Sequence, residues 1–303
     1  MTKAIFVFIA SFLLLLPFVL TTGGIPNSYQ LIICLPFILF LGIPHGAIDN
    51  VLYIRDKRIK NIQFISVYIV FIVVNIALWF IFPWLAYIAF LLLSAYHFGQ
   101  SQFSHYFKNQ HISKQLLFLF WGISILSALI YFNIADIQQL MLQEEEFAVF
   151  RPFHQESLLL TLFLVSSIVT FLLMLVLNIR KALTLESFFM EALVFSLILI
   201  CFYLMPLLIG FTLYFVILHS FKVLREEYGF LLTEKKVSSV GNFIKLVSPF
   251  TLISIFGILI IYGLIYFKLF TLPYGYSLLI IISSITLPHV FVMNRFYKLF
   301  QKG

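Results

Sequence analysis

Charged residues are scarce in this chain of 303 residues: Asp and Glu number 12, Lys and Arg 19, and charged side chains make up only 10% of the sequence. Hydrophobic residues account for 62%, and the mean hydropathy is +1.08. A water-soluble domain cannot bury so much apolar surface, and no stretch is polar and long enough to form one. The composition therefore excludes a soluble globular protein and predicts a single integral membrane domain, residues 1–303, built as an all-α bundle of transmembrane helices.

Cysteine is scarce as well, and acidic residues are fewer than basic ones. Cys34 and Cys201 both lie in apolar runs, where a thiol packs as a small hydrophobic side chain, so we expect neither a disulfide nor a metal-binding cysteine pair. The net charge of +7 requires no nucleic-acid partner, because the cytoplasmic loops of membrane proteins normally carry an excess of Lys and Arg.

About ten segments are apolar and long enough to span a bilayer, given that a span needs about 20 residues. Proline breaks a helix interior but is tolerated in the first helical turn, so Phe82-Pro83 and Met205-Pro206 predict tight turns between neighbouring spans. The predicted spans are 4–20, 29–49, 62–82, 84–103, 115–132, 157–178, 186–205, 206–224, 243–267 and 275–297.

The N-terminal segment has one lysine followed by an apolar run, as a secretory signal peptide does. No small-x-small cleavage site follows, so we expect the first helix to be retained. With the N-terminus inside, the inner loops and tails hold all but two of the 19 Lys and Arg residues, namely Arg151 and Lys268. The one long outer loop, 133–156, is acidic and has room for a small amphipathic element. This charge distribution predicts both termini in the cytoplasm and a multi-pass protein of the cell (inner or plasma) membrane.

Four histidines lie within the apolar segments: His45, His97, His219 and His289. Their helices are predicted to run in the same direction, and a rise of 1.5 Å per residue places all four on the order of 20 Å below the outer surface. A polar side chain in hydrocarbon is costly, so an ionisable residue inside a membrane marks a candidate functional site. A single such histidine is commonly satisfied by a backbone carbonyl or a hydroxyl, but four at one depth favour a shared metal ion.

The donor type indicates iron. Neutral imidazole suits Fe, Zn and Cu, and all-nitrogen ligation with open positions suits an iron that must also bind oxygen. Few carboxylates lie near these histidines, which argues against a di-iron carboxylate centre, and the HxxxH and HxxHH clusters of membrane desaturases are absent. The three remaining histidines are predicted to be ordinary solvated loop residues: His105, His111 and His154.

Two polar residues are candidates for supporting contacts, since a metal-bound imidazole usually donates its second nitrogen to a carboxylate or a carbonyl. Asp49 lies one turn after His45, and Gln100 lies three residues after His97. Asp49 is equally compatible with a role as a helix cap or loop charge.

Glycine, proline and aromatic residues surround the same positions. Pro44 and Pro288 directly precede two of the histidines, and Gly42 and Gly46 flank the first; such residues bend a helix or allow close backbone approach. Aromatic residues make up 18% of the chain, and most must face lipid or pack in the core. A subset close to the histidines would suit a long, flat polyene: Phe98, Phe103, Tyr214, Phe215 and Phe291.

Four short motifs carry a family likeness: GIPHGAID, SAYHFGQ, YFVILHSFK and LPHVFV. Together, from about residue 40 to residue 297, they resemble the Brp/Blh family of bacterial and archaeal β-carotene 15,15′-dioxygenases. The resemblance implies an integral membrane enzyme that uses histidine-bound iron(II) and O2 to split β-carotene at its central double bond. The implied product is two molecules of all-trans-retinal, typically supplied to a microbial rhodopsin.

The resemblance implies that His45, His97 and His219 are iron ligands and catalytic residues. Members of the family often hold another histidine one turn after the third ligand, where this chain has Val223. We expect either three ligands or completion of the set by His289, and the matched depth favours His289. Gln100 stands where an acidic residue is common, which leaves its supporting contact open.

Three other interpretations remain at this point. A haem-binding electron carrier would need axial histidine pairs, and two haems would need pairs at two depths, which four histidines at one depth fit poorly. A non-catalytic transporter or assembly protein could use the histidines to pair with one another or to relay protons. A relative of the family could also cleave another carotenoid.

Overall fold

The computed structural model describes the chain except for residues 1, 22–26, 54–60, 108–111 and 301–303. The described residues form helices joined by short turns and contain no strand, which confirms the all-α prediction. Several residues that enter the topology prediction lie outside the described residues: Arg55, Lys57, Arg58, Lys60, Lys108 and Lys302, together with the loop residue His111. The cytoplasmic location of the termini stays a prediction.

Nine helices in the described part of the chain are long and apolar enough to cross a membrane, which makes this a multi-pass membrane protein. The expected segment 84–103 also forms a helix, α5 (Pro83–Phe103), but it is not one of the nine. Buried polar side chains such as His97, Gln100 and Gln102 account for its lower hydropathy. The nine candidate spans are Lys3–Thr21, Tyr29–Tyr53, Ile62–Ile81, Ile112–Phe132, Glu156–Ile179, Leu185–Leu204, Leu207–Thr233, Val240–Tyr266 and Tyr274–Leu299.

Both proline turns are confirmed. Helix α4 (Asn61–Ile81) ends one residue before Phe82, and α5 begins at Pro83. Helix α9 (Leu185–Leu204) ends before Pro206, and α10 (Leu207–Thr212) starts directly after it. Proline lacks the N–H that a helix interior needs, whereas the first turn leaves that donor unused in any case.

The second predicted span is not a continuous helix, contrary to the expectation for 29–49. It consists of α2 (Asn27–Phe37), the π-helix η1 (Ile38–Gly42), the 3-10 helix η2 (Ile43–Gly46) and α3 (Asp49–Tyr53). Pro36 near the end of α2 and Pro44 in η2 each lack a backbone N–H, which weakens an α-helical ladder along this stretch. The Ala47 N–H instead donates to the Pro44 carbonyl at 3.0 Å and closes a tight turn beside His45.

The chain divides into two compact units: residues 1–42, 95–139 and 152–224 form the first, and residues 43–94, 140–151 and 225–303 form the second. Helix α5 runs through residues of both. The single membrane domain over residues 1–303 stays a prediction.

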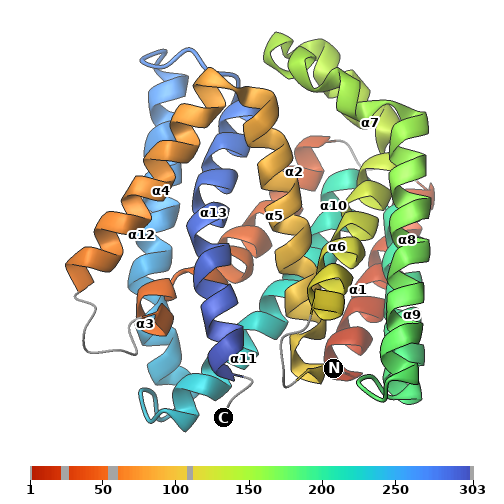
Figure 1. Ribbon diagram of the computed structural model, residues 1–303. Helices are drawn as coiled ribbons and strands as arrows, with labels where there is room; N and C mark the ends of the chain where they lie inside the picture. Colours follow the sequence, from red (N-terminus) through yellow and green to blue (C-terminus); the bar gives the residue numbers. More distant parts are fainter. Residues whose placement is uncertain (1, 22–26, 54–60, 108–111, 301–303) are drawn as a thin grey trace. The chain divides into compact units, whose positions relative to one another are not determined.

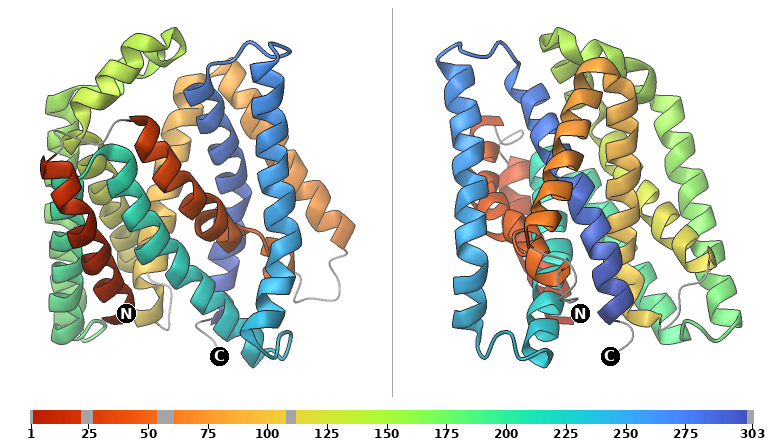
Figure 2. Two further views of the ribbon diagram at one scale, coloured as in Figure 1. Left: turned by 180° about the vertical axis from the view of Figure 1, so that it is seen from behind. Right: turned by 60° about the vertical axis from the view of Figure 1, so that its left-hand side comes forward.

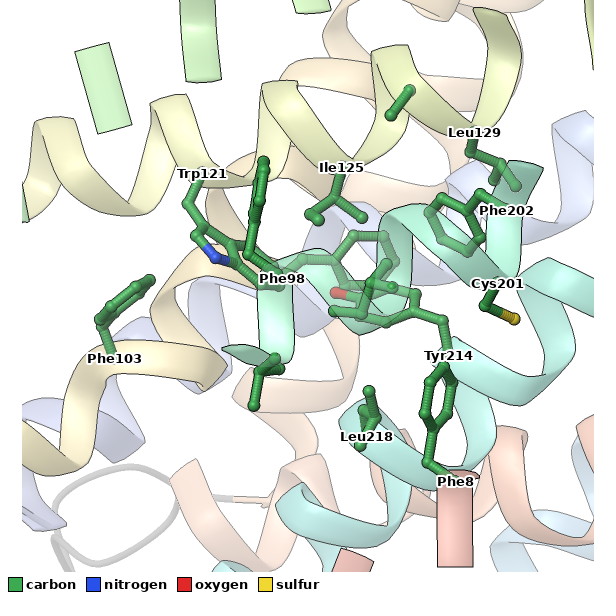
Figure 3. Packing of buried hydrophobic residues seen from close by; sticks show 14 of the residues in the cluster. Phe8, Phe98, Phe103, Trp121, Ile125, Leu129, Cys201, Phe202, Tyr214 and Leu218 are labelled. Atoms are coloured by element: carbon green, nitrogen blue, oxygen red, sulfur yellow. The ribbon is translucent and has the colours of Figure 1, made fainter. Parts of the chain in front are cut away.

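In the first unit, α6 (Ile112–Phe132) and α8 (Glu156–Ile179) pack along each other (Figure 1). Helix α1 (Thr2–Thr21) lies beside the π-helix η5 (Leu213–Ser220), as Figure 2 shows. Trp121, Phe98 and Tyr214 pack in the core with Phe202 and Cys201 (Figure 3). Cys34 and Cys201 are both buried free thiols, as expected.

Glycine makes a close helix contact possible in this unit. A Cβ atom at Gly99 would overlap the carbonyl oxygen of Phe118, and one at Gly122 would overlap the carbonyl oxygen of Ala95. The end of α5 and helix α6 therefore touch backbone to backbone, as helices with small interfacial residues do in membranes. This contact holds the segment that carries His97.

In the second unit, α13 (Tyr274–Phe300) packs on α4, and polar side chains join the two helices. The Asn75 amide donates to the hydroxyls of Ser283 and Ser284 at 3.0 Å each, and the Trp79 indole donates to Ser283 at 2.6 Å. Such interhelical hydrogen bonds stabilise helix association where water is absent. Pro288 lies inside α13 without interrupting it.

The long outer loop carries helical structure, as its length and pattern allowed. It forms α7 (Ile134–Gln143) and the 3-10 helix η4 (Glu145–His154). Glu145 and Glu146 are exposed, which agrees with a solvated acidic face, whereas Phe150 is fully buried. His154 is buried as well, so the prediction that it is solvated was wrong. His105 is exposed, as expected.

Candidate metal centre

One pair of predicted ligands lies in the second unit. The 3-10 helix η2 presents His45, and α13 presents His289; both side chains are buried. Their ring centroids lie 5.0 Å apart, with an interplanar angle of 80°. His45 therefore lies on a 3-10 turn and not on a continuous α-helix.

Asp49 supports this pair, but through His289 rather than through His45. The Nδ1 atom of His289 lies 2.9 Å from one carboxylate oxygen of Asp49 and 3.1 Å from the other. The Tyr68 hydroxyl donates to the same carboxylate at 3.1 Å. A carboxylate that accepts from Nδ1–H leaves Nε2 as the metal-binding nitrogen. Gly46 allows this arrangement, because a Cβ atom there would lie only 3.3 Å from Nδ1 of His289.

The other pair lies in the first unit. His97 on α5 and His219 near the end of η5 are both buried, with ring centroids 4.9 Å apart and an interplanar angle of 82°. The Ser101 hydroxyl lies 2.9 Å from the carbonyl oxygen of Phe98 and 2.9 Å from Nδ1 of His219. A hydroxyl has one proton to donate. Because that proton goes to Phe98, the serine oxygen accepts from Nδ1–H of His219, and Nε2 is then the nitrogen that could bind a metal.

The backbone around His219 is a π-helix of eight residues, Leu213–Ser220. Such segments are rare and occur frequently at functional sites, where the extra residue per turn changes the direction of a side chain. Val223 follows on α11 (Phe221–Thr233) and is fully buried. The residue in the place of the family's additional histidine is therefore a packed hydrophobic side chain.

Three of the five aromatic candidates lie around His219. Phe215 stacks on its ring at 5.6 Å and 19°, and Phe98 meets it edge-on at 4.8 Å. Tyr214 contacts Phe98 at 5.5 Å. Phe103 instead packs against Trp121 in the core, and Phe291 is half exposed and stacks on Phe71 in the second unit.

The first unit also contains a buried carboxylate that was not predicted from the sequence. Glu191 on α9 is 1% exposed and accepts from the Gln102 amide at 2.6 Å and from the Tyr106 hydroxyl at 2.8 Å. Burial and the Glu191 charge raise the pKa of Tyr106, so its hydroxyl remains a donor. The Lys222 ammonium donates to the Gln102 carbonyl at 2.7 Å. This network joins α5, α9, α11 and the 3-10 helix η3 (Ser104–Tyr106), and a glutamate within an apolar run was its only sequence signal.

His45 and His289 in the second unit and His97 in the first unit are buried imidazole donors of the kind that hold metal ions. Imidazole donors are compatible with iron and equally with zinc or copper, so the choice of iron stays a prediction. Asp49 contacts His289 rather than His45, its neighbour in the sequence, and its role in supporting a metal site stays a prediction. Gln100 is fully buried, and its predicted role beside His97 stays a prediction.

The comparison with known proteins agrees with these observations. Residues 37–297 match the protein family described as Beta-carotene 15,15′-dioxygenase, and the matched range contains all four membrane histidines. The chain matches no curated protein and no solved structure. A match over this much of the chain decides the classification: this protein belongs to the beta-carotene 15,15′-dioxygenase family.

Proposed function

We propose that this protein cleaves β-carotene at its central 15,15′ double bond with O2 and releases two molecules of all-trans-retinal. Two buried histidine pairs within the membrane helices of a chain of this family are the main support. In this proposal residues 1–303 act as one membrane domain, and His45, His97, His219 and His289 hold a single iron(II) ion.

The reaction balances without any further reductant. The C15=C15′ bond breaks, each of its two carbons gains one oxygen atom, and both oxygen atoms come from one O2 molecule. O2 is the oxidant and the two alkene carbons are oxidised to aldehydes. The chain therefore needs no site for a nicotinamide or flavin donor.

Two of the four proposed ligands, His219 and His289, have a protein acceptor on their second ring nitrogen. The Asp49 carboxylate accepts a hydrogen bond from Nδ1 of His289, and the Ser101 hydroxyl oxygen accepts one from Nδ1 of His219. Both contacts orient the Nε2 atoms and make the imidazoles better donors. Iron bound there would supply the oxygen-activating chemistry, which amino-acid side chains lack. In this proposal, His289 serves as the fourth ligand, because this chain has Val223 at the position where family members often have a histidine.

The protein's own work is to position the polyene and exclude water. Phe98 and Phe215 lie against the ring of His219 and offer flat apolar surfaces beside the proposed ligand. A nonpolar substrate dissolved in the bilayer can reach such surfaces sideways between helices.

The remaining assignments follow from the same proposal. The protein resides in the cell membrane with both termini in the cytoplasm, and its substrates are β-carotene and O2. The retinal it releases would pass to a microbial rhodopsin, a protein that needs this aldehyde as its chromophore.

The decisive experiment is expression of the full chain in a bacterium that accumulates β-carotene, with loss of pigment and formation of retinal measured together. We expect two retinal molecules for each β-carotene consumed. Purified protein should contain about one iron per chain and lack the strong Soret band of haem. Pigment loss without retinal would indicate another cleavage position, and unchanged pigment in membranes that contain the protein would contradict the proposal.

A further inference from the structure

A second acidic side chain lies buried in the unit that holds His45 and His289. Glu227 is on α11, within the apolar run Leu207–Thr233, and its side chain is 0% exposed. Neither of its carboxylate oxygens has a hydrogen-bond partner among the residues that the structure describes. It differs in this from Glu191 and Asp49, whose oxygens accept hydrogen bonds.

An ionised carboxylate in an apolar interior is strongly destabilising unless a positive charge or hydrogen-bond donors compensate it. The charged groups that act most on Glu227 are both acidic, namely Asp49 and Glu226. Glu226 is only partly buried and accepts from the Tyr297 hydroxyl at 3.1 Å. The Glu226–Tyr297 contact joins α11 to α13, the helix that carries His289, and the Lys236 ammonium donates to the carbonyl of Val51, two residues after Asp49, at 3.0 Å.

Four neutral imidazoles would bring no negative charge to a divalent cation. An iron(II) ion bound by them would carry two positive charges into an environment of low dielectric constant, where interactions between charges are strong. Asp49, in contact with His289, supplies one opposite charge. A second carboxylate nearby would make the whole assembly neutral.

We propose that Glu227 is this second counter-charge, a positioning residue that raises the affinity of the histidine site for a divalent metal ion. The inference rests on the proposed function and extends it to a residue outside the four family motifs. Glu227 is not one of the four proposed ligands, so it acts through its charge or through a bound water rather than as a direct ligand.

The test is a metal titration of the full chain purified in detergent without metal, using Co²⁺ as the spectroscopic probe. We expect Glu227→Gln to weaken Co²⁺ binding about 10-fold or more, in the range found when supporting residues of metal sites are removed. Glu227→Asp keeps the charge and should retain most of the affinity. The matched control is Glu226→Gln, which removes a neighbouring charge that has its own partner and should change the affinity less than about 3-fold.

Thermal unfolding with and without Co²⁺ gives a second measurement. Without metal, Glu227→Gln should be at least as stable as the native chain, because a buried amide is less costly than an uncompensated carboxylate. Added Co²⁺ should then raise its unfolding temperature less than that of the native chain. If Glu227→Gln binds Co²⁺ as tightly as the native chain, Glu227 is a neutral acid at the site and the inference is wrong.

The two proposals can fail separately. If the native chain binds Co²⁺ more tightly than Glu227→Gln but forms no retinal with iron, the charge role stands and the proposed reaction is wrong. If retinal forms normally and both proteins bind Co²⁺ equally, the reverse holds. A native chain that binds no divalent metal at all would contradict both.

Discussion

The Nδ1 atom of His289 lies 2.9 Å from a carboxylate oxygen of Asp49, although 240 residues separate them in the sequence. Tyr68 donates to the other oxygen of the same carboxylate, so three helical segments meet at one acidic group. A metal-binding imidazole is normally oriented in this way by an acceptor on its second nitrogen. The contact therefore makes His289 a better candidate ligand than its single short sequence motif suggested.

Removal of a proposed ligand should abolish retinal formation. His97→Ala and His289→Ala are each expected to give no detectable retinal in a β-carotene-producing host, because an incomplete donor set holds iron poorly. Retinal output and the amount of protein in the membrane fraction are measured together. His105→Ala, at an exposed histidine, serves as the control and should leave output unchanged. Full activity of His289→Ala would show that three histidines suffice.

Asp49→Asn should lower the metal affinity by about 10- to 100-fold, since the amide cannot provide the charge that stabilises the proton on Nδ1 of His289. Tyr68→Phe removes only one donor to that carboxylate and should have a smaller effect. Titration of the metal-free protein with Co²⁺ ranks the two variants. Equal affinities for Asp49→Asn and the native chain would exclude the proposed support.

Exchange of the metal should separate binding from chemistry. Treatment with a chelator is expected to remove activity and to lower the unfolding temperature, because a ligand of the folded state stabilises it. Fe²⁺ should restore both properties, whereas Zn²⁺, which has no redox chemistry, should restore stability alone. Recovery of activity with Zn²⁺ would contradict an oxygenase mechanism. The measurements are retinal formation and a thermal unfolding curve for each metal.

Gly99→Ala should destabilise the first unit, because the added Cβ overlaps the carbonyl of Phe118 and must push α5 and α6 apart. The expected loss is about 1–3 kcal/mol in the free energy of unfolding, as for other overpacked cores. Gly257→Ala is the matched control: it lies in helix α12 (Val240–Tyr266) with nothing within 4 Å of the new atom. That control should be neutral or slightly stabilising, since alanine favours helix more than glycine does. Unfolding in detergent compares the two, and equal stabilities would show that the helices can separate without loss.

Several local features follow from the sequence alone. The apolar composition specified a membrane helix bundle, because only structures that satisfy their own backbone hydrogen bonds are stable in lipid. The turns at Pro83 and Pro206 followed from the geometry of proline. The motif around His45 indicated the family, but the proline-induced break before this histidine was not expected, since hydropathy does not distinguish α-, π- and 3-10 helices.

The four histidines and Asp49 could be identified from the sequence because each is a polar residue in or beside an apolar run. Burying a polar side chain in a membrane costs free energy, so such a residue marks a candidate functional site. Their partners could not be identified in this way. Which histidine contacts Asp49, where Glu191 finds its donors, and that Glu227 is buried near Asp49 all depend on the rotation and packing of helices that lie far apart in the chain. Helix packing sets these rotations through contacts such as the close backbone approach of Gly99 to Phe118, so only the tertiary structure decided which groups meet.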